Sequence, residues 1–281
     1  VSNPITVRQY QHFIEDRLNT VNELIAEGKV REAFDLVEQI RDWVPRNPPS
    51  VPKRSFTPEN VETLLNDAFN NIGLRWSITN IGFNGKRRYI LNDPVEYGSP
   101  VSKHRILPNQ SITSIPYNAA EAYTQWRAAQ DGRPYRIISA REKEIISRNG
   151  FPWTYPWGYH FRRTALASRL VHRDLKNDAY SHPQGTHPLG PNYFRDFVAY
   201  GRYQEDGSLT RLVDLIGNDR EWTSTVGEER TRVMSGGSVR SPSGNLFLPA
   251  STTYATERDW VAECNGAFRL VLPLPPSRRG R

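Results

Sequence analysis

The chain of 281 residues is 37% hydrophobic and carries a net charge of +7, with 31 Arg and only six Lys. No apolar run approaches the length of about 18 residues needed to cross a bilayer, so we expect no membrane span. The single cysteine, Cys264, excludes a disulfide framework, and the six scattered His form no HExxH or HxxxH pair, which argues against a histidine-metal active site.

The positive charge is spread along the chain and forms a block only at the tail, Arg278 to Arg281. A solvated basic surface is therefore favoured over a nucleic-acid interface, and we do not expect nucleic acid as a partner. The opening residues, Val1 to Pro4, show no signal peptide, so the chain as given is expected to be cytoplasmic. The Arg enrichment suits a thermophilic or high-GC source.

Helical periodicity dominates the start of the chain. Residues 6–26 predict a helix, because Thr6 and Gln9 form a capping box and apolar residues follow at helical spacing. Gly28 ends this helix, and a second one is predicted from Val30 to about residue 44. Two antiparallel helices joined by a short turn are expected.

Residues 45–56 are rich in Pro and predict an extended linker. A third helix, capped by Thr57, is predicted beyond it. Two short strands between residues 74 and 89 flank the Asn84-Gly85 pair, which is a hairpin signal. Residues 92–116 resemble a loop.

The middle of the chain predicts two further helices. Asn118 opens the first, with Glu121 completing its cap and with Ala122, Tyr123 and Trp126 as its apolar stripe. A short strand is predicted at residues 135–138. The second helix is capped by Ser139 and Glu142 and stops at the following Asn-Gly pair.

The second half predicts short strands between long loops at 152–158 and 177–210. Residues 232–234 and 268–271 are expected to be paired core strands, and residues 273–281 an unstructured basic tail. Helices in the first half and strands in the second indicate an α+β fold rather than a doubly wound sheet.

The stretch from Asp214 to Trp222 combines a Leu-Ile pair, a Gly-Asn turn, two carboxylates and a large aromatic residue. Asp214 and Glu221 would converge if Gly217 and Asn218 turn the backbone, and carboxylates with inward carbonyls suit a hard cation. A tight turn anchored by Trp222 with solvated acids is the alternative, and the spacing alone leaves both open.

Seven motifs, in order, resemble the formylglycine-generating-enzyme/sulfatase-modifying family, whose fold is α+β and C-type-lectin-like. They are Ile5–Phe13 ("VTNxQYxxF"), Ile115–Trp126 ("VSWxDAxAYxxW"), Tyr135–Glu144 ("YRLPTEAEWE"), Tyr155–Gly158 ("YPWG"), Asp214–Trp222 ("DMxGNVxEW"), Ser235–Ser238 ("RGGSW") and Gly266–Arg269 ("GFR" with one inserted residue). The resemblance implies a single domain over 1–272, with a helical insertion at 15–75.

The same resemblance argues against oxidase activity. The family's oxidases use two cysteines just past the "GGS" motif to bind copper, and residues 239–249 contain none. Cys264 alone cannot form that site, and the three-His iron site of the related sulfoxide synthases has no counterpart here. We therefore expect no copper, no iron and no enzymatic activity.

A structural calcium ion is the one cofactor that the resemblance favours. In the family, calcium is held at the "GN" turn by two side chains and two backbone carbonyls. The matching positions here are Asp214, Gly217, Asp219 and Glu221.

The chain is most similar to the variable proteins of diversity-generating retroelements, in which a segment between "GGSW" and "GFR" is randomised at template adenines. Asn codons diversified in this way never yield Trp, Lys, Glu, Gln or Met. Within residues 239–265, only Glu257, Trp260 and Glu263 fall outside the permitted set.

We therefore expect residues 239–265, called segment 239–265 below, to bind a ligand, most simply a protein. Its candidate contact residues are of types suited to interfaces: Val239, Arg240, Ser241, Ser243, Asn245, Phe247, Thr252, Thr253, Tyr254, Asp259, Val261, Cys264 and Asn265. Two alternatives stay open, a structural lectin-like module that contacts partners through helices 6–72 and an unconventional oxidase. The sequence does not define the oligomeric state.

Overall fold

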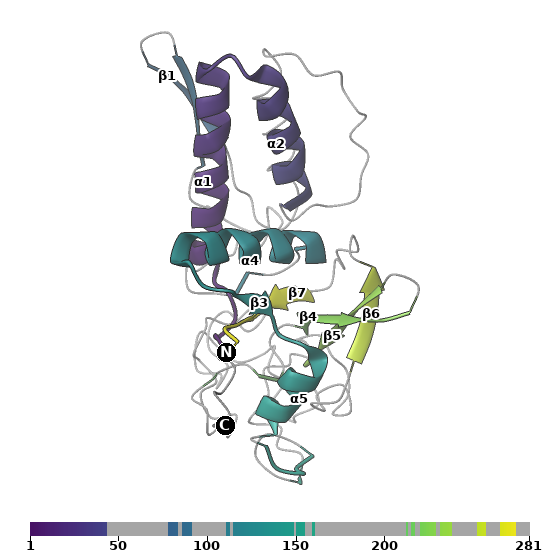
Figure 1. Ribbon diagram of the computed structural model, residues 1–281. Coiled ribbons are helices and arrows are strands. Elements are labelled where there is room, and N and C mark those ends of the chain that lie inside the picture. Colours follow the sequence, from purple (N-terminus) through teal and green to yellow (C-terminus); the bar gives the residue numbers. More distant parts are fainter. Residues whose placement is uncertain are drawn as a thin grey trace, which may run out of the picture.

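In this computed structural model, the described strands form three sheets, and helices precede and separate them along the chain (Figure 1). The structure describes residues 1–43, 78–83, 86–91, 111–112, 115–148, 150–154, 159–160, 212, 215–216, 220–228, 231–237, 252–256 and 265–273. It describes the backbone alone for residues 41–42, 78–83, 86–91, 252–256 and 265. No helix in these ranges is both long and apolar enough to cross a membrane.

The central sheet has four strands in the order β6-β5-β4-β7: Thr252–Thr256, Thr231–Ser235, Arg220–Val226 and Asn265–Phe268. β4 pairs antiparallel with β5 and parallel with β7, and β5 pairs antiparallel with β6. A smaller ladder joins β3 (Arg136–Ile137) to β8 (Leu270–Val271).

The sheet corrects one sequence prediction. Residues 232–234 and 268–271 do form core strands, but β5 and β7 are not partners, because β4 lies between them. The sequence analysis predicts no strand at β4, whose first three residues belong to the turn expected at 214–222. Its burial is high in the first half and decreases toward Val226, as expected for a strand that leaves the core.

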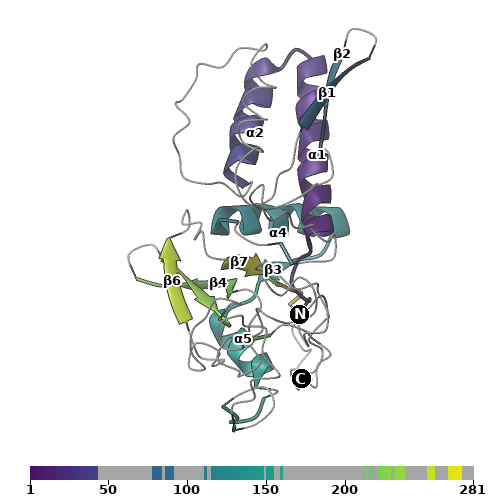
Figure 2. The ribbon, with the colours of Figure 1, turned by 180° about the vertical axis from the view of Figure 1, so that it is seen from behind.

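The two N-terminal helices form the predicted hairpin. α1 (Val7–Ala26) begins at Thr6, which forms the expected capping box with Gln9, and the chain turns at Gly28 with φ +75°. α2 is Val30–Trp43. Figures 1 and 2 show this hairpin extending away from the central sheet, with the β1–β2 hairpin (Ile78–Phe83 and Lys86–Leu91) beside α1. The predicted linker at 45–56 and the helix at Thr57 lie outside the described residues.

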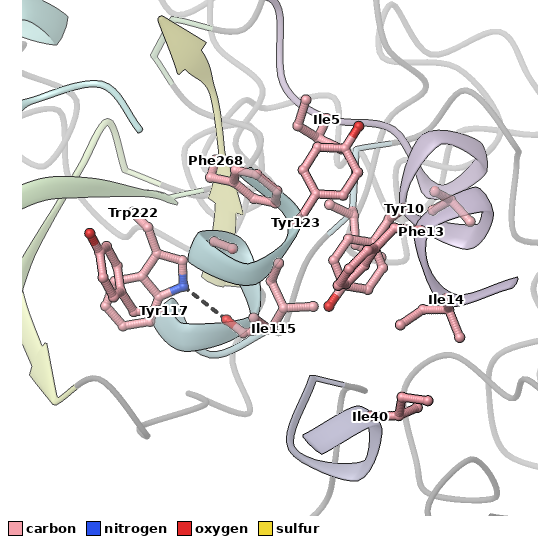
Figure 3. Packing of buried hydrophobic residues seen from close by; sticks show 14 of the residues in the cluster. Ile5, Tyr10, Phe13, Ile14, Ile40, Ile115, Tyr117, Tyr123, Trp222 and Phe268 are labelled. Atoms are coloured by element: carbon pink, nitrogen blue, oxygen red, sulfur yellow. Dashed lines mark hydrogen bonds between the residues drawn. The ribbon is translucent and has the colours of Figure 1, made fainter. Parts of the chain in front are cut away.

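An aromatic cluster joins the helical hairpin to the sheet (Figure 3). Tyr123 stacks on Tyr10 and meets both Phe13 and Phe268 edge to face. The hydroxyl of Tyr10 donates a 2.6 Å hydrogen bond to the carbonyl of Trp43 at the end of α2. Large buried aromatic side chains contribute much of the packing energy of a core, so this cluster fixes where the hairpin stands.

α4 (Tyr117–Asp131) begins differently from the prediction. Its N-cap is Pro116 and not Asn118, and no side chain caps it, so Glu121 does not complete a capping box. Tyr123 is buried as expected, whereas Ala122 and Trp126 are only partly buried. The helix ends at Gly132, which adopts the left-handed conformation that glycine tolerates.

α5 (Ala140–Ser147) confirms the predicted capping box at Ser139 and Glu142. Arg136 also holds both carboxylate oxygens of Glu142. The hydrogen bond from Arg136, outweighing the effect of desolvation, lowers the pKa of Glu142 to about 2. A second tie comes from Thr225 on β4, whose Oγ1 accepts from the amide of Ala140 at 2.9 Å. α5 is thus fixed against β4 at its first turn.

Gly266 sets a sharp requirement for the packing of Trp222. Trp222 Nε1 donates a buried 2.8 Å hydrogen bond to the carbonyl of Ile115 (Figure 3). Gly266 lies beside that bond with φ +105°, and a Cβ there would meet Ile115 O at 2.5 Å and Trp222 Nε1 at 3.0 Å. These atoms belong to backbone and to a buried ring, so they have little room to move.

We predict that Gly266→Ala lowers the free energy of unfolding by roughly 3 kcal/mol or more, through backbone strain and loss of the Trp222 hydrogen bond. Gly132→Ala is the matched control, because Gly132 is also left-handed but a Cβ there meets nothing within 4 Å. That change should cost only about 1–2 kcal/mol. Urea denaturation of both variants checks this, and equal losses would contradict the proposed steric cause.

Candidate functional site

Segment 239–265 follows a bend at the end of β5, and its last residue begins β7 of the same sheet. We call Ser235–Gly237 the turn. β5 ends at Ser235, and Gly236 and Gly237 follow with φ of +106° and +68°. All three residues are buried. The segment reaches β7, which begins at Asn265 and pairs with β4. The segment is therefore bounded in sequence by β5 and β7, the two strands that flank β4.

Three buried charged side chains lie beneath this turn. Glu221 on β4 accepts from the Lys143 ammonium of α5, with Nζ 2.9 Å from Oε2. It also accepts from Arg269, whose Nε lies 2.8 Å from Oε2 and 3.0 Å from Oε1. The side chains of all three are at most 2% exposed. We call Lys143, Glu221 and Arg269 the ion cluster.

The ion cluster keeps Glu221 ionised. Burial alone raises the pKa of this carboxyl group, but the nearby charges of Arg269 and Lys143, together with their hydrogen bonds, lower it more, and the net pKa lies below its ordinary value. A buried carboxylate is tolerated when cations and hydrogen bonds replace the lost water.

Lys143 also supports the turn directly. Its Nζ donates a 3.0 Å hydrogen bond to the carbonyl of Ser235, the last residue of β5. A Cβ at Gly236 would lie 2.8 Å from the same nitrogen. The ammonium thus lies close to the backbone of Gly236, whose φ of +106° is a conformation that residues with a side chain rarely adopt.

Few of the predicted contact residues lie in the described part of the chain. Thr252, Thr253 and Tyr254 lie in β6, where they pair with Ser235, Met234 and Val233 of β5. Asn265 is the first residue of β7. The other predicted contact residues of segment 239–265 lie outside the described residues, so their role stays a prediction.

Of the four predicted calcium ligands, only Glu221 lies in the described part of the chain. Asp214, Gly217 and Asp219 lie outside the described residues. Glu221 is described, and it is buried in the ion cluster rather than solvated. In the described ranges, no group of three or more His, Cys, Asp and Glu side chains is placed to hold a metal. The calcium site stays a prediction.

The sequence analysis missed the role of Lys143. Lysine in a short amphipathic helix is normally solvated, so its residue type gave no reason to single it out. A signal was nonetheless present, because the motif "YRLPTEAEWE" that residues 135–144 resemble has a tryptophan where this chain has Lys143. A position that holds tryptophan in a related sequence is a candidate for burial. Arg269 belonged to a motif but had no partner assigned.

The ion cluster joins secondary-structure elements that lie far apart in the sequence. It connects α5, β4 and the residue between β7 and β8 through one carboxylate, and Lys143 adds the end of β5. Each link is a charge-assisted hydrogen bond, which is shorter and stronger than a neutral one. The arrangement thus fixes the sheet where segment 239–265 begins.

We predict that Glu221→Gln lowers the free energy of unfolding by about 3–5 kcal/mol, because it leaves two buried cations with a weaker partner. Glu144→Gln on α5 is the control: Glu144 pairs with Arg141 and Arg148 along the same helix, and losing such partly exposed pairs should cost about 1 kcal/mol or less. Chemical denaturation at neutral pH measures both, and similar losses would contradict the argument.

Glu221→Gln should also change how the free energy of unfolding depends on pH. Since folding lowers the pKa of Glu221, its contribution to stability is present above the ordinary value of 4.5 and is lost as the pH falls below it. The acid-side decline in stability should therefore be shallower in Glu221→Gln than in the unmodified chain.

Comparison with known proteins gives the following likenesses. Residues 2–271 match the family model described as the sulfatase-modifying factor enzyme 1-like domain. PvdO from Pseudomonas aeruginosa is a similar solved structure, at 16% identity and a TM-score of 0.44, with 63% of this chain and 70% of that chain covered. CarF is similar at 16% identity and 0.42, covering 60% and 69%. Treponema denticola variable protein 1 is similar at 10% identity and 0.44, covering 69% and 91%.

No curated protein matches the chain by sequence. The family match nonetheless spans every described helix and strand, including all three members of the ion cluster. The chain therefore belongs to the sulfatase-modifying factor enzyme 1-like domain family, and its fold is the α+β, C-type-lectin-like fold that the motifs predict.

Proposed function

We propose that this protein is a non-enzymatic binding protein that recognises a protein ligand through segment 239–265. The main support is the way the segment is attached. Its ends lie at strands that flank β4, and its middle contributes β6, which pairs with β5 over five residues. A recognition segment that has part of its length paired in a sheet has fewer residues to order when it binds, and so loses less conformational entropy.

The composition of the segment supports the same proposal. Arg240, Phe247 and Tyr254 are of the types that contribute most binding energy at protein interfaces, and the Ser and Thr residues around them adapt their hydrogen bonding. The chain's single cysteine, Cys264, leaves no pair of thiols for the copper chemistry that the family's oxidases are expected to use. Binding therefore explains the segment better than catalysis does.

A second candidate is a structural module that contacts partners through its helices. It is favoured by the helical hairpin, which projects from the sheet and is held firmly at its base (Figure 1). There, Trp126 Nε1 donates a 2.9 Å hydrogen bond to Asp16, in addition to the aromatic cluster. The outer face of α2 exposes Arg31, Glu32 and Asp35, which suit a polar contact.

One experiment separates the two candidates. We expect that exchanging segment 239–265 for that of a relative lowers affinity for the chain's own protein ligand by roughly tenfold or more, since the contact residues move with the segment. The control is a chain with Arg31, Glu32 and Asp35 all changed to Ala, which should bind as before. Isothermal titration of both variants against that protein ligand measures the two affinities. A loss of affinity in the triple variant, with none in the exchanged chain, would favour the helical module.

We also propose that segment 239–265 is diversified by a retroelement. The neighbouring DNA should then carry a reverse transcriptase gene and a near-copy of the 3′ end of this gene. Differences between the two copies are expected at adenines of the near-copy, within the codons of segment 239–265. Sequencing the locus checks this, and differences spread over all four bases, or over the codons of α1 and α4, would argue against diversification.

A further inference from the structure

The burial of Lys143 is costly, and its surroundings indicate what offsets the cost. Its side chain is 2% exposed. Lysine side chains normally keep their ammonium in water, and removing that charge from water costs several kcal/mol unless partners replace the hydration. Here a carboxylate oxygen of Glu221 lies at 2.9 Å and the carbonyl oxygen of Ser235 at 3.0 Å.

These partners resemble the ligands of a hard metal ion. Calcium in proteins takes carboxylate and backbone carbonyl oxygens. The Lys143 ammonium is bound by one oxygen of each kind, from adjacent strands β4 and β5. The aliphatic part of the Lys143 side chain extends to these oxygens from α5, so the positive charge comes from the protein and not from a bound ion.

Glu221, in contrast, is a poor ligand for an added divalent ion. Its Oε2 already accepts from Lys143 and from Arg269, and its Oε1 accepts from Arg269. A calcium ion at the usual bond length of roughly 2.3–2.6 Å from either oxygen would lie close to two fixed positive charges in a buried site. Glu221 therefore does not fit the role of calcium ligand that the family resemblance implies for it.

We propose that the Lys143 ammonium is a built-in cation that takes the place of a metal ion at Glu221 and positions the Ser235–Gly237 turn. Gly236 is part of the arrangement, because a Cβ there would lie 2.8 Å from Nζ. The turn from which segment 239–265 departs is consequently held without calcium. This property is separate from ligand binding, so it stands or falls independently of the proposed function.

The test measures how the melting temperature of the full chain depends on calcium, by circular dichroism in EGTA and in millimolar calcium. If the folded chain had a calcium site, free calcium at about 100 times its Kd would raise the melting temperature by roughly 5 °C. We expect no rise, or a rise that Glu221→Gln retains, because either result shows that Glu221 is not a ligand. A saturable rise that Glu221→Gln abolishes would overturn the proposal.

A second arm tests the ammonium. Lys143→Met, which keeps the length of the side chain without the charge, should lower the melting temperature by several degrees more than Lys29→Met, whose ammonium is half exposed and pairs with Glu27. Lys143→Arg, which keeps a cation, should lose less than Lys143→Met. If Lys143→Met costs no more than Lys29→Met, the ammonium does not hold the turn and the proposal fails.

A third measurement avoids the question of whether Glu221→Gln folds. Crystals of the unmodified chain grown with calcium should show no metal bonded to Glu221. Metal density within bonding distance of either carboxylate oxygen would overturn the proposal without any variant.

Discussion

The pairing of Glu221 with Lys143 and Arg269 is the interaction on which the site depends. A buried carboxylate must be neutralised, and here the two cations come from distant parts of the sequence. Satisfying one charge therefore brings together α5, β4 and the residue between β7 and β8, and Lys143 extends the connection to the last residue of β5. The geometry of the turn before segment 239–265 follows from this electrostatic requirement.

The second constraint is steric and involves the next residue of β4. Trp222, next to Glu221 in sequence, is fully buried and bonded to the carbonyl of Ile115 just before α4. Gly266 leaves room for that contact, and Phe268 continues the same strand into the aromatic cluster beneath the helical hairpin. Adjacent residues of β4 thus connect the sheet in two directions, toward α5 through charge and toward α1 and α4 through packing.

The sequence predicted local structure better than long-range pairing. Capping boxes at Thr6 and Ser139 and the Gly28 break are short-range signals, and the corresponding helices were confirmed. The N-cap of α4 was wrong because Asn118 and Glu121 matched the spacing of a capping box, whereas Pro116 occupies the position. β4 and the strand order could not be derived, because register depends on contacts between residues far apart in the chain.

The candidate site was predictable only in part. The motif from Asp214 to Trp222 identified Glu221 as a residue of interest, but not its partners, since nothing in sequence spacing connects residue 221 with 143 and 269. A lysine in a short polar helix also gives no sign of burial by itself. The account requires that the stability of the sheet comes from its own buried contacts and not from residues 239–251, the part of segment 239–265 that precedes β6.

Amide hydrogen exchange tests that claim most directly, comparing the unmodified chain with one in which residues 239–251 are replaced by an unrelated polar sequence of equal length. The account predicts the same slow exchange in both for the amides of Trp222, Thr223 and Val233, which lie in β4 and β5. Fast exchange of these amides in the substituted chain would show that the segment supports the sheet, and would contradict the account.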